Sequence, residues 1–114
     1  MLGGRYRRDT DYQAAIKDKS TAIQFKDFGF LYWHRGAIYH DMGKYDLALK
    51  DYATALVDEE RPAGILIDRA KTYEAMGRVN DAVADYRRVY AACVKYTPPV
   101  ADCSDDLKRL GASP

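Results

Sequence analysis

The chain is poor in the residues from which chemical sites are usually built. Its 114 residues include two cysteines, two histidines and one tryptophan. The formal net charge is +1, so no excess of one sign draws the chain to nucleic acid or to acidic membrane surfaces. No run approaches the ~18 consecutive apolar residues that a membrane-spanning helix needs. We therefore expect no nucleic-acid partner and no membrane insertion.

The few candidate ligands also lack the spacing of a metal site. His34 and His40 are six residues apart in the sequence, so they do not share the face that a helical zinc pair requires. Neither Cys93 nor Cys103 belongs to a C-x-x-C motif, and no glycine-rich phosphate loop follows a strand pattern. We predict no metal site, no cofactor and no enzymatic activity.

Tyrosine is plentiful instead, with ten tyrosines against three phenylalanines. Tyr39 and Tyr73 are 34 residues apart, as are Tyr52 and Tyr86. The same offset relates further identical residues: Arg35 with Arg69, Met42 with Met76, Gly43 with Gly77, Ala48 with Ala82, and Asp51 with Asp85. The shared residues are the small, aromatic and turn-forming types that a repeated helix hairpin needs.

Apolar and small residues recur at helical spacing within each repeat. The pattern predicts helices over residues 29–43 and 45–56, and again over 62–77 and 79–90. We expect Gly43 to end the first of these helices, because glycine readily adopts the left-handed conformation of a helix C-terminus. Such a hairpin cannot bury its apolar face alone, so it stacks on neighbours.

This pattern resembles the tetratricopeptide repeat (TPR) family, whose 34-residue unit has a large residue, a Leu-Gly pair, Tyr, Ala, an aromatic residue and Pro. These positions are filled by Tyr32, Gly36, Tyr39, Ala48 and Tyr52 in one unit, and by Leu66, Ala70, Tyr73, Ala82 and Tyr86 in the next. Two departures are that Arg35 and Arg69 replace the usual Leu, and that Pro62 comes about two residues late.

A third copy is half present, because residues 12–18 match residues 45–51 at an offset of 33. We predict an all-α, TPR-type α-solenoid of antiparallel helix hairpins, with about two and a half repeats in a single domain, residues 1–114. Its parts are the lone second helix of a partial repeat (9–25), two full repeats (29–62 and 63–96) and a C-terminal capping helix (within 99–110).

Charged and aromatic residues that recur in every unit have a structural interpretation. We predict that Arg35 and Arg69 pair with aspartates of adjacent helices, drawn from Asp18, Asp51 and Asp85. The repeated tyrosines, Tyr39, Tyr52, Tyr73 and Tyr86, are expected to be packing residues that keep their hydroxyl groups near the rim.

The TPR resemblance implies a partner-binding groove on the first helix of each hairpin. The corresponding residues here are Phe30, Trp33, Ala37, His40, Ile67, Lys71 and Glu74. Trp33 and Ile67 would give this groove an apolar floor. The polar residues His40, Lys71 and Glu74 would orient a partner. The alternative for Trp33 is burial against the N-terminal helix or against another copy of the chain.

The predicted function is therefore a non-enzymatic scaffold that holds a peptide or helix of a partner protein. One alternative is self-association through an N-terminal edge formed by Ala15, Ile16, Ala22 and Ile23, which lacks the helix that would cover it. Another is a docking domain within a larger protein. The identity of a partner is not indicated.

The redox state expected for the two cysteines depends on the cellular compartment of the protein. The spacing permits a disulfide between Cys93 and Cys103, and equally permits two free thiols. Residues 1–5 have no apolar stretch of the signal-peptide type, which favours the cytoplasm by default. Because the chain begins partway through a repeat, an upstream leader is also compatible, and an exported or periplasmic protein would favour the disulfide.

Overall fold

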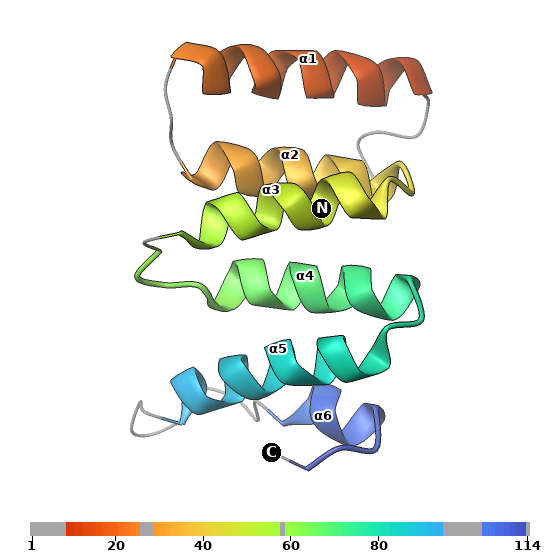
Figure 1. Cartoon of the computed structure of the whole chain (residues 1–114), viewed down its shortest axis with the longest axis vertical. Helices are drawn as coiled ribbons and strands as arrows, with labels where there is room; N and C mark the ends of the chain where they lie inside the picture. The colour runs from red at the N-terminus through yellow and green to blue at the C-terminus, as the bar shows by residue number, and fades with distance from the viewer. Residues whose placement is uncertain (1–8, 26–28, 58, 95–103, 114) are drawn as a thin grey trace. The chain divides into compact units, whose positions relative to one another are not determined.

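The computed structural model describes residues 9–25, 29–57, 59–94 and 104–113, with the side chains of residues 9, 10 and 22–25 outside this description. The chain divides after Glu60 into two compact units, here called unit 1 and unit 2. Unit 1 contains α1 (Asp9–Phe25), α2 (Gly29–Asp41) and α3 (Tyr45–Leu56) (Figure 1). Unit 2 contains α4 (Ala63–Ala75), α5 (Val79–Cys93) and α6 (Asp105–Arg109). Every regular element of the described residues is a helix, which confirms the all-α prediction.

Each full hairpin turns at a glycine, as the sequence predicted. Gly43 has a φ of 79° between α2 and α3, and Gly77 has a φ of 78° between α4 and α5. The following residue closes the turn, since the Lys44 amide donates to the Tyr39 carbonyl at 2.9 Å and the Arg78 amide donates to the Tyr73 carbonyl at 2.8 Å. These bonds satisfy carbonyl groups that the end of a helix would leave without partners.

Small residues let the two helices of a hairpin approach each other. Gly36 of α2 lies so close to α3 that an added Cβ atom would be 2.8 Å from Cε1 of Tyr52 and 3.2 Å from the Ala48 carbonyl oxygen. Ala48 and Tyr52 are themselves buried. In unit 2 the equivalent position is the buried Ala70, which belongs to one core cluster with Ala82 and Tyr86. The repeated small residues thus face repeated tyrosines.

An arginine–aspartate pair joins the two helices of each hairpin, which confirms the predicted pairing. Arg35 Nε and Nη2 donate to Asp51 at 2.7 Å each. Arg69 donates to Asp85 in the same bidentate way, at 2.8 and 2.7 Å. Hydrogen bonding to Asp51 raises the pKa of Arg35, and hydrogen bonding to Asp85 does the same for Arg69. Asp18, the third candidate, is exposed on α1.

The repeated tyrosines pack at different depths. Tyr52 and Tyr86 are buried, whereas Tyr39 and Tyr73 are half-buried. The guanidinium carbon of Arg35 lies 5.8 Å from the ring centre of Tyr39, and that of Arg69 lies 5.8 Å from the ring centre of Tyr73. At these distances the rings attract the cations that also bind the aspartates.

Helix α1 packs on α2 in unit 1. Ala15 is buried in this packing, and Arg35 Nη1 donates to Ser20 Oγ at 3.1 Å. Arg35 therefore contacts both α1 and α3, since its other nitrogen atoms bind Asp51.

Helix α6 packs on α5 in unit 2, where Leu107 is buried in the core cluster. The capping segment predicted for residues 99–110 thus contains a helix, although it is confined to Asp105–Arg109 among the described residues. Its end is fixed by Gly111, which has a φ of 72°, and by the Ala112 amide, which donates to the Leu107 carbonyl at 2.8 Å. Arg87 Nε of α5 donates to the Ser113 carbonyl at 3.0 Å.

Breaking the Arg35–Asp51 pair should destabilise unit 1 strongly. The Asp51 side chain is 4% exposed, so Arg35→Met leaves a buried carboxylate without its counter-charge. We expect a loss of about 3 kcal/mol in the free energy of unfolding, measured by urea denaturation with circular dichroism. Arg35→Met combined with Asp51→Leu should recover most of this loss, because an apolar pair needs no charge compensation.

The matched control is Arg78→Met, which removes an exposed ion pair. Arg78 and Asp81 are each 48% exposed, so this variant should lose less than ~1 kcal/mol. If Arg35→Met and Arg78→Met lost equal amounts of unfolding free energy, the burial of Asp51 would not explain the contribution of the Arg35–Asp51 pair to stability.

Adding a methyl group at Gly36 should destabilise the hairpin of unit 1. Gly36→Ala places its Cβ against the Tyr52 ring and the backbone of α3, and we expect a cost of about 1–3 kcal/mol in the same assay. Gly29→Ala is the control, because its nearest neighbour outside the helix is the Ala55 carbonyl oxygen at 3.5 Å. A Gly36→Ala protein as stable as the Gly29→Ala protein would contradict this account of the close approach.

Candidate functional site

Helix α2 carries aromatic side chains that keep part of their surface accessible within unit 1. Phe30 is 51% exposed, and Trp33 and His34 are half-buried. The Phe30 and His34 ring centres are 5.7 Å apart in an edge-on arrangement, and those of Trp33 and His34 are 6.2 Å apart. These three residues, spaced i, i+3 and i+4 along one helix, are called the aromatic patch below.

The imidazole of the aromatic patch is held in its neutral form. Burial lowers the pKa of His34 from its ordinary value of 6.5, and the positive charge of Lys19 on α1 lowers it further. At neutral pH the three rings of the patch are therefore uncharged. The positive charge of Lys19 acts on the His34 ring.

The remaining predicted groove residues of α2 are Ala37 and His40, both half-buried. The His40 ring centre lies 5.4 Å from that of Tyr45 on α3. Four of the predicted groove residues therefore belong to α2 and keep part of their surface accessible: Phe30, Trp33, Ala37 and His40. Trp33 is half-buried within unit 1, and its burial against another copy of the chain stays an untested alternative.

Helix α4 carries the other three predicted groove residues, and they differ in availability. Lys71 is exposed and Ile67 is half-buried. Glu74 is half-buried, and its carboxylate is hydrogen-bonded by side chains of its own unit. The sequence had suggested instead that this carboxylate faces a partner.

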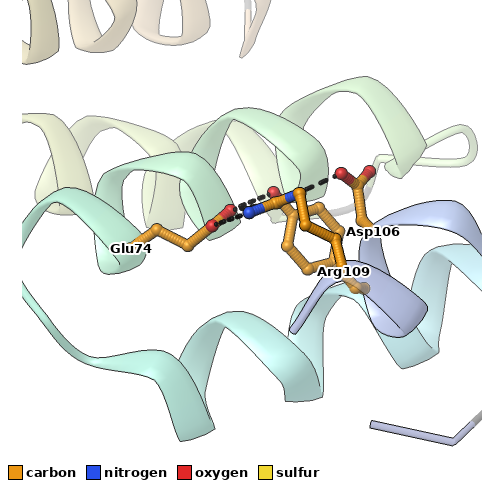
Figure 2. A network of polar contacts seen from close by, with 4 residues as sticks. Glu74, Asp106 and Arg109 are labelled. Atoms are coloured by element: carbon orange, nitrogen blue, oxygen red, sulfur yellow. Dashed lines mark hydrogen bonds and ion pairs between the residues drawn. The ribbon is translucent and has the colours of Figure 1, made fainter. Parts of the chain in front are cut away.

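Glu74 is the centre of a polar network that ties three helices of unit 2 together (Figure 2). Arg109 of α6 donates to both carboxylate oxygens, at 2.6 and 2.9 Å. Tyr86 of α5 donates its hydroxyl to Glu74 Oε2 at 2.5 Å. Arg109 Nη2 also donates to Asp106 Oδ1 at 3.2 Å. These contacts join α4, α5 and α6 through one carboxylate.

The network shifts the proton affinity of its members. Hydrogen bonding from Arg109 is the main cause that lowers the pKa of Glu74 below its ordinary value of 4.5. Burial, with the hydrogen bond to Glu74, raises the pKa of Tyr86. Glu74 is thus a carboxylate and Tyr86 a neutral phenol at neutral pH, which are the states that the hydrogen bonds require.

Sequence reasoning missed both His34 in the aromatic patch and Arg109 in the polar network. His34 follows Trp33 and lies four residues after Phe30, so helical spacing alone could have placed it on their face. Arg109 is 35 residues from Glu74, and the repeat pattern ends before α6, so no periodic signal connects the two.

The predicted self-association edge is described for two of its four residues. Ala15 is buried and Ile16 is half-buried, while the side chains of Ala22 and Ile23 lie outside the described residues. Among the residues of α1 whose side chains are described, the exposed ones are Asp11, Gln13, Ala14, Lys17, Asp18 and Thr21. Ala15 is therefore covered within unit 1, and self-association through this edge stays an untested prediction.

Cys93, the last residue of α5, is not a free thiol but takes part in a disulfide. Cys103 lies outside the described residues, so the pairing of Cys93 with Cys103 stays a prediction.

Within the described part of the chain, no group of three His, Cys, Asp or Glu side chains is arranged to hold a metal ion. None of the described helices has the length and apolar character needed to cross a membrane.

Comparison with known families agrees with the hairpin geometry. The family model for the tetratricopeptide repeat matches residues 31–56, which comprise most of α2 and all of α3. The chain thus carries a tetratricopeptide repeat, which confirms the family predicted from its periodicity. Repeats of this family are protein–protein interaction modules and are generally not catalytic. No curated protein and no solved structure gives a significant match.

The polar network should make the stability of unit 2 depend on pH. Because the folded pKa of Glu74 is lowered, its contribution is present above its ordinary pKa of 4.5 and is lost as the pH falls through the lower folded value. Urea denaturation between about pH 6 and about pH 3 should therefore show a larger loss of stability for the wild type than for Glu74→Gln.

Two further variants separate the ion pair from a general effect of acid. Arg109→Ala removes the main cause of the Glu74 shift and should flatten the pH dependence as Glu74→Gln does. Arg88→Ala, which changes an exposed arginine of α5, should retain the wild-type dependence. Identical pH profiles for all four proteins would contradict a role for Glu74.

Proposed function

We propose that this chain is a non-enzymatic scaffold that binds a peptide or helix of a partner protein through the first helix of its hairpins. The observation that carries the proposal is the accessible aromatic patch of α2, on a helix whose other faces pack against α1 and α3. Unit 1 offers Phe30, Trp33, Ala37 and His40, and unit 2 offers Ile67 and Lys71 on α4.

The mechanism is burial of an apolar partner side chain, with polar groups that fix its orientation. Exposed aromatic residues bury large areas on binding and lose little conformational entropy, so they commonly dominate binding energy. Phe30 and Trp33 supply this area in unit 1. In unit 1 the half-buried His40 supplies hydrogen bonds. In unit 2, taken by itself, the exposed Lys71 supplies charge beside Ile67. Glu74 is left out of the proposed binding residues, because Arg109 and Tyr86 occupy its carboxylate.

A selection from a library of random peptides about 12 residues long tests this function. Peptides enriched on the immobilised wild type should bind Phe30→Ser and Trp33→Ala at least about 10-fold more weakly, because aromatic anchors carry most of the energy of such interfaces. Trp33 is the one tryptophan of the chain, so its fluorescence reports binding to the wild type and to Phe30→Ser. Binding to Trp33→Ala is measured by isothermal titration calorimetry.

The matched control is Leu47→Ala, which alters an exposed apolar residue of α3 outside the proposed surface. It should bind the enriched peptides as the wild type does. Phe30→Ser keeps the test valid if Trp33→Ala folds poorly, because Phe30 is half-exposed and close to the start of α2. A selection that returns no peptide sensitive to either aromatic variant would overturn the proposed function.

A further inference from the structure

The charge beside the aromatic patch indicates what kind of partner it favours. Ser20 of α1 accepts a hydrogen bond from Arg35 of α2 at 3.1 Å, which places this turn of α1 against the turn of α2 that carries His34. Lys19, the neighbour of Ser20, is half-buried, and its charge acts on His34. The uncharged rings of the patch thus lie beside the turn of α1 that carries Lys19.

Two classes of ligand fit an aromatic surface, and Lys19 discriminates between them. Aromatic rings attract cations through their faces, so a lysine or arginine of a partner is one candidate. Lys19 opposes it, because a second cation close to the ammonium group would be repelled. An apolar side chain next to a carboxylate has neither difficulty, since the rings bury the apolar part and Lys19 attracts the charge.

We propose that the aromatic patch and Lys19 together bind an acidic peptide segment in which an apolar side chain lies next to Asp or Glu. The apolar side chain covers Phe30 and Trp33 and displaces water from them. The carboxylate then pairs with Lys19 at the edge of this drier surface, where the attraction is stronger than in bulk water. This inference rests on the proposed function and names the chemical class of its partner.

The experiment uses the peptides enriched on the wild-type chain in the selection described above. One of them is synthesised with its acidic residues intact and again with each Asp or Glu changed to Asn or Gln. Both forms are titrated, with Trp33 fluorescence as the readout, against the wild type, Lys19→Gln and Lys50→Gln. Lys50 is an exposed lysine of α3 and serves as the charge-matched control.

Acidic residues should be enriched beside the apolar anchor. Lys19→Gln should weaken binding of the acidic peptide by about 2- to 5-fold, the range expected for a solvent-accessible ion pair, and Lys50→Gln should leave it unchanged. The neutral peptide should bind the wild type and Lys19→Gln equally, because the partner of Lys19 has been removed from the peptide. The effect of Lys19→Gln should also shrink at higher salt.

The two proposals fail in different ways. Enrichment of neutral or basic peptides that still depend on Phe30 and Trp33 would overturn the acidic partner and leave the scaffold function standing. An acidic peptide whose affinity is the same with Lys19 and with Gln at this position would overturn the role of Lys19. A selection without any peptide that depends on the aromatic patch would overturn the function and this inference together.

Discussion

The bidentate arginine–aspartate pair is the interaction on which each hairpin depends. Asp51 and Asp85 are buried, and a buried carboxylate is stable only when a cation and hydrogen-bond donors compensate it. Each arginine reaches its aspartate from the facing helix, so the pair forms only in the correct register of the two helices. In unit 1 the same guanidinium also binds Ser20, so one side chain aligns α1, α2 and α3. The accessible part of α2 is the surface of that helix which this packing does not cover.

The repeat made most of the fold predictable from the sequence. The offset of 34 residues placed the helices, the glycine turns and the ion pairs, because each depends on residues that recur in both units. The C-terminal region was less predictable. Helix α6 has five residues and no counterpart in the repeat, so neither its length nor its contact with Glu74 follows from periodicity. A helix this short depends on tertiary packing, which for α6 centres on Leu107.

The sequence placed the candidate groove residues on two helices but could not indicate which of their side chains are accessible. Family resemblance placed seven groove residues on the first helices of the hairpins, and four of them lie on α2 with part of their surface accessible. The resemblance could not indicate that Glu74 is occupied, because its partner Arg109 comes from outside the repeat. Nor could it indicate that Lys19 of α1 sets the charge next to His34, since that effect arises from the packing of α1 on α2.

The two hairpins are less interchangeable than their shared residues suggest. Gly36 faces Tyr52 with no room for a methyl group, whereas its equivalent in unit 2 is Ala70, which already carries one in a core cluster with Tyr86. A recombinant that joined the alanine-bearing helix to α3 would bring a Cβ atom into the Tyr52 ring. The reciprocal recombinant would place glycine opposite Tyr86 and leave a cavity. Exchange of a single helix between the two hairpins would therefore destabilise both, whereas exchange of a whole hairpin would keep each small residue with its own tyrosine.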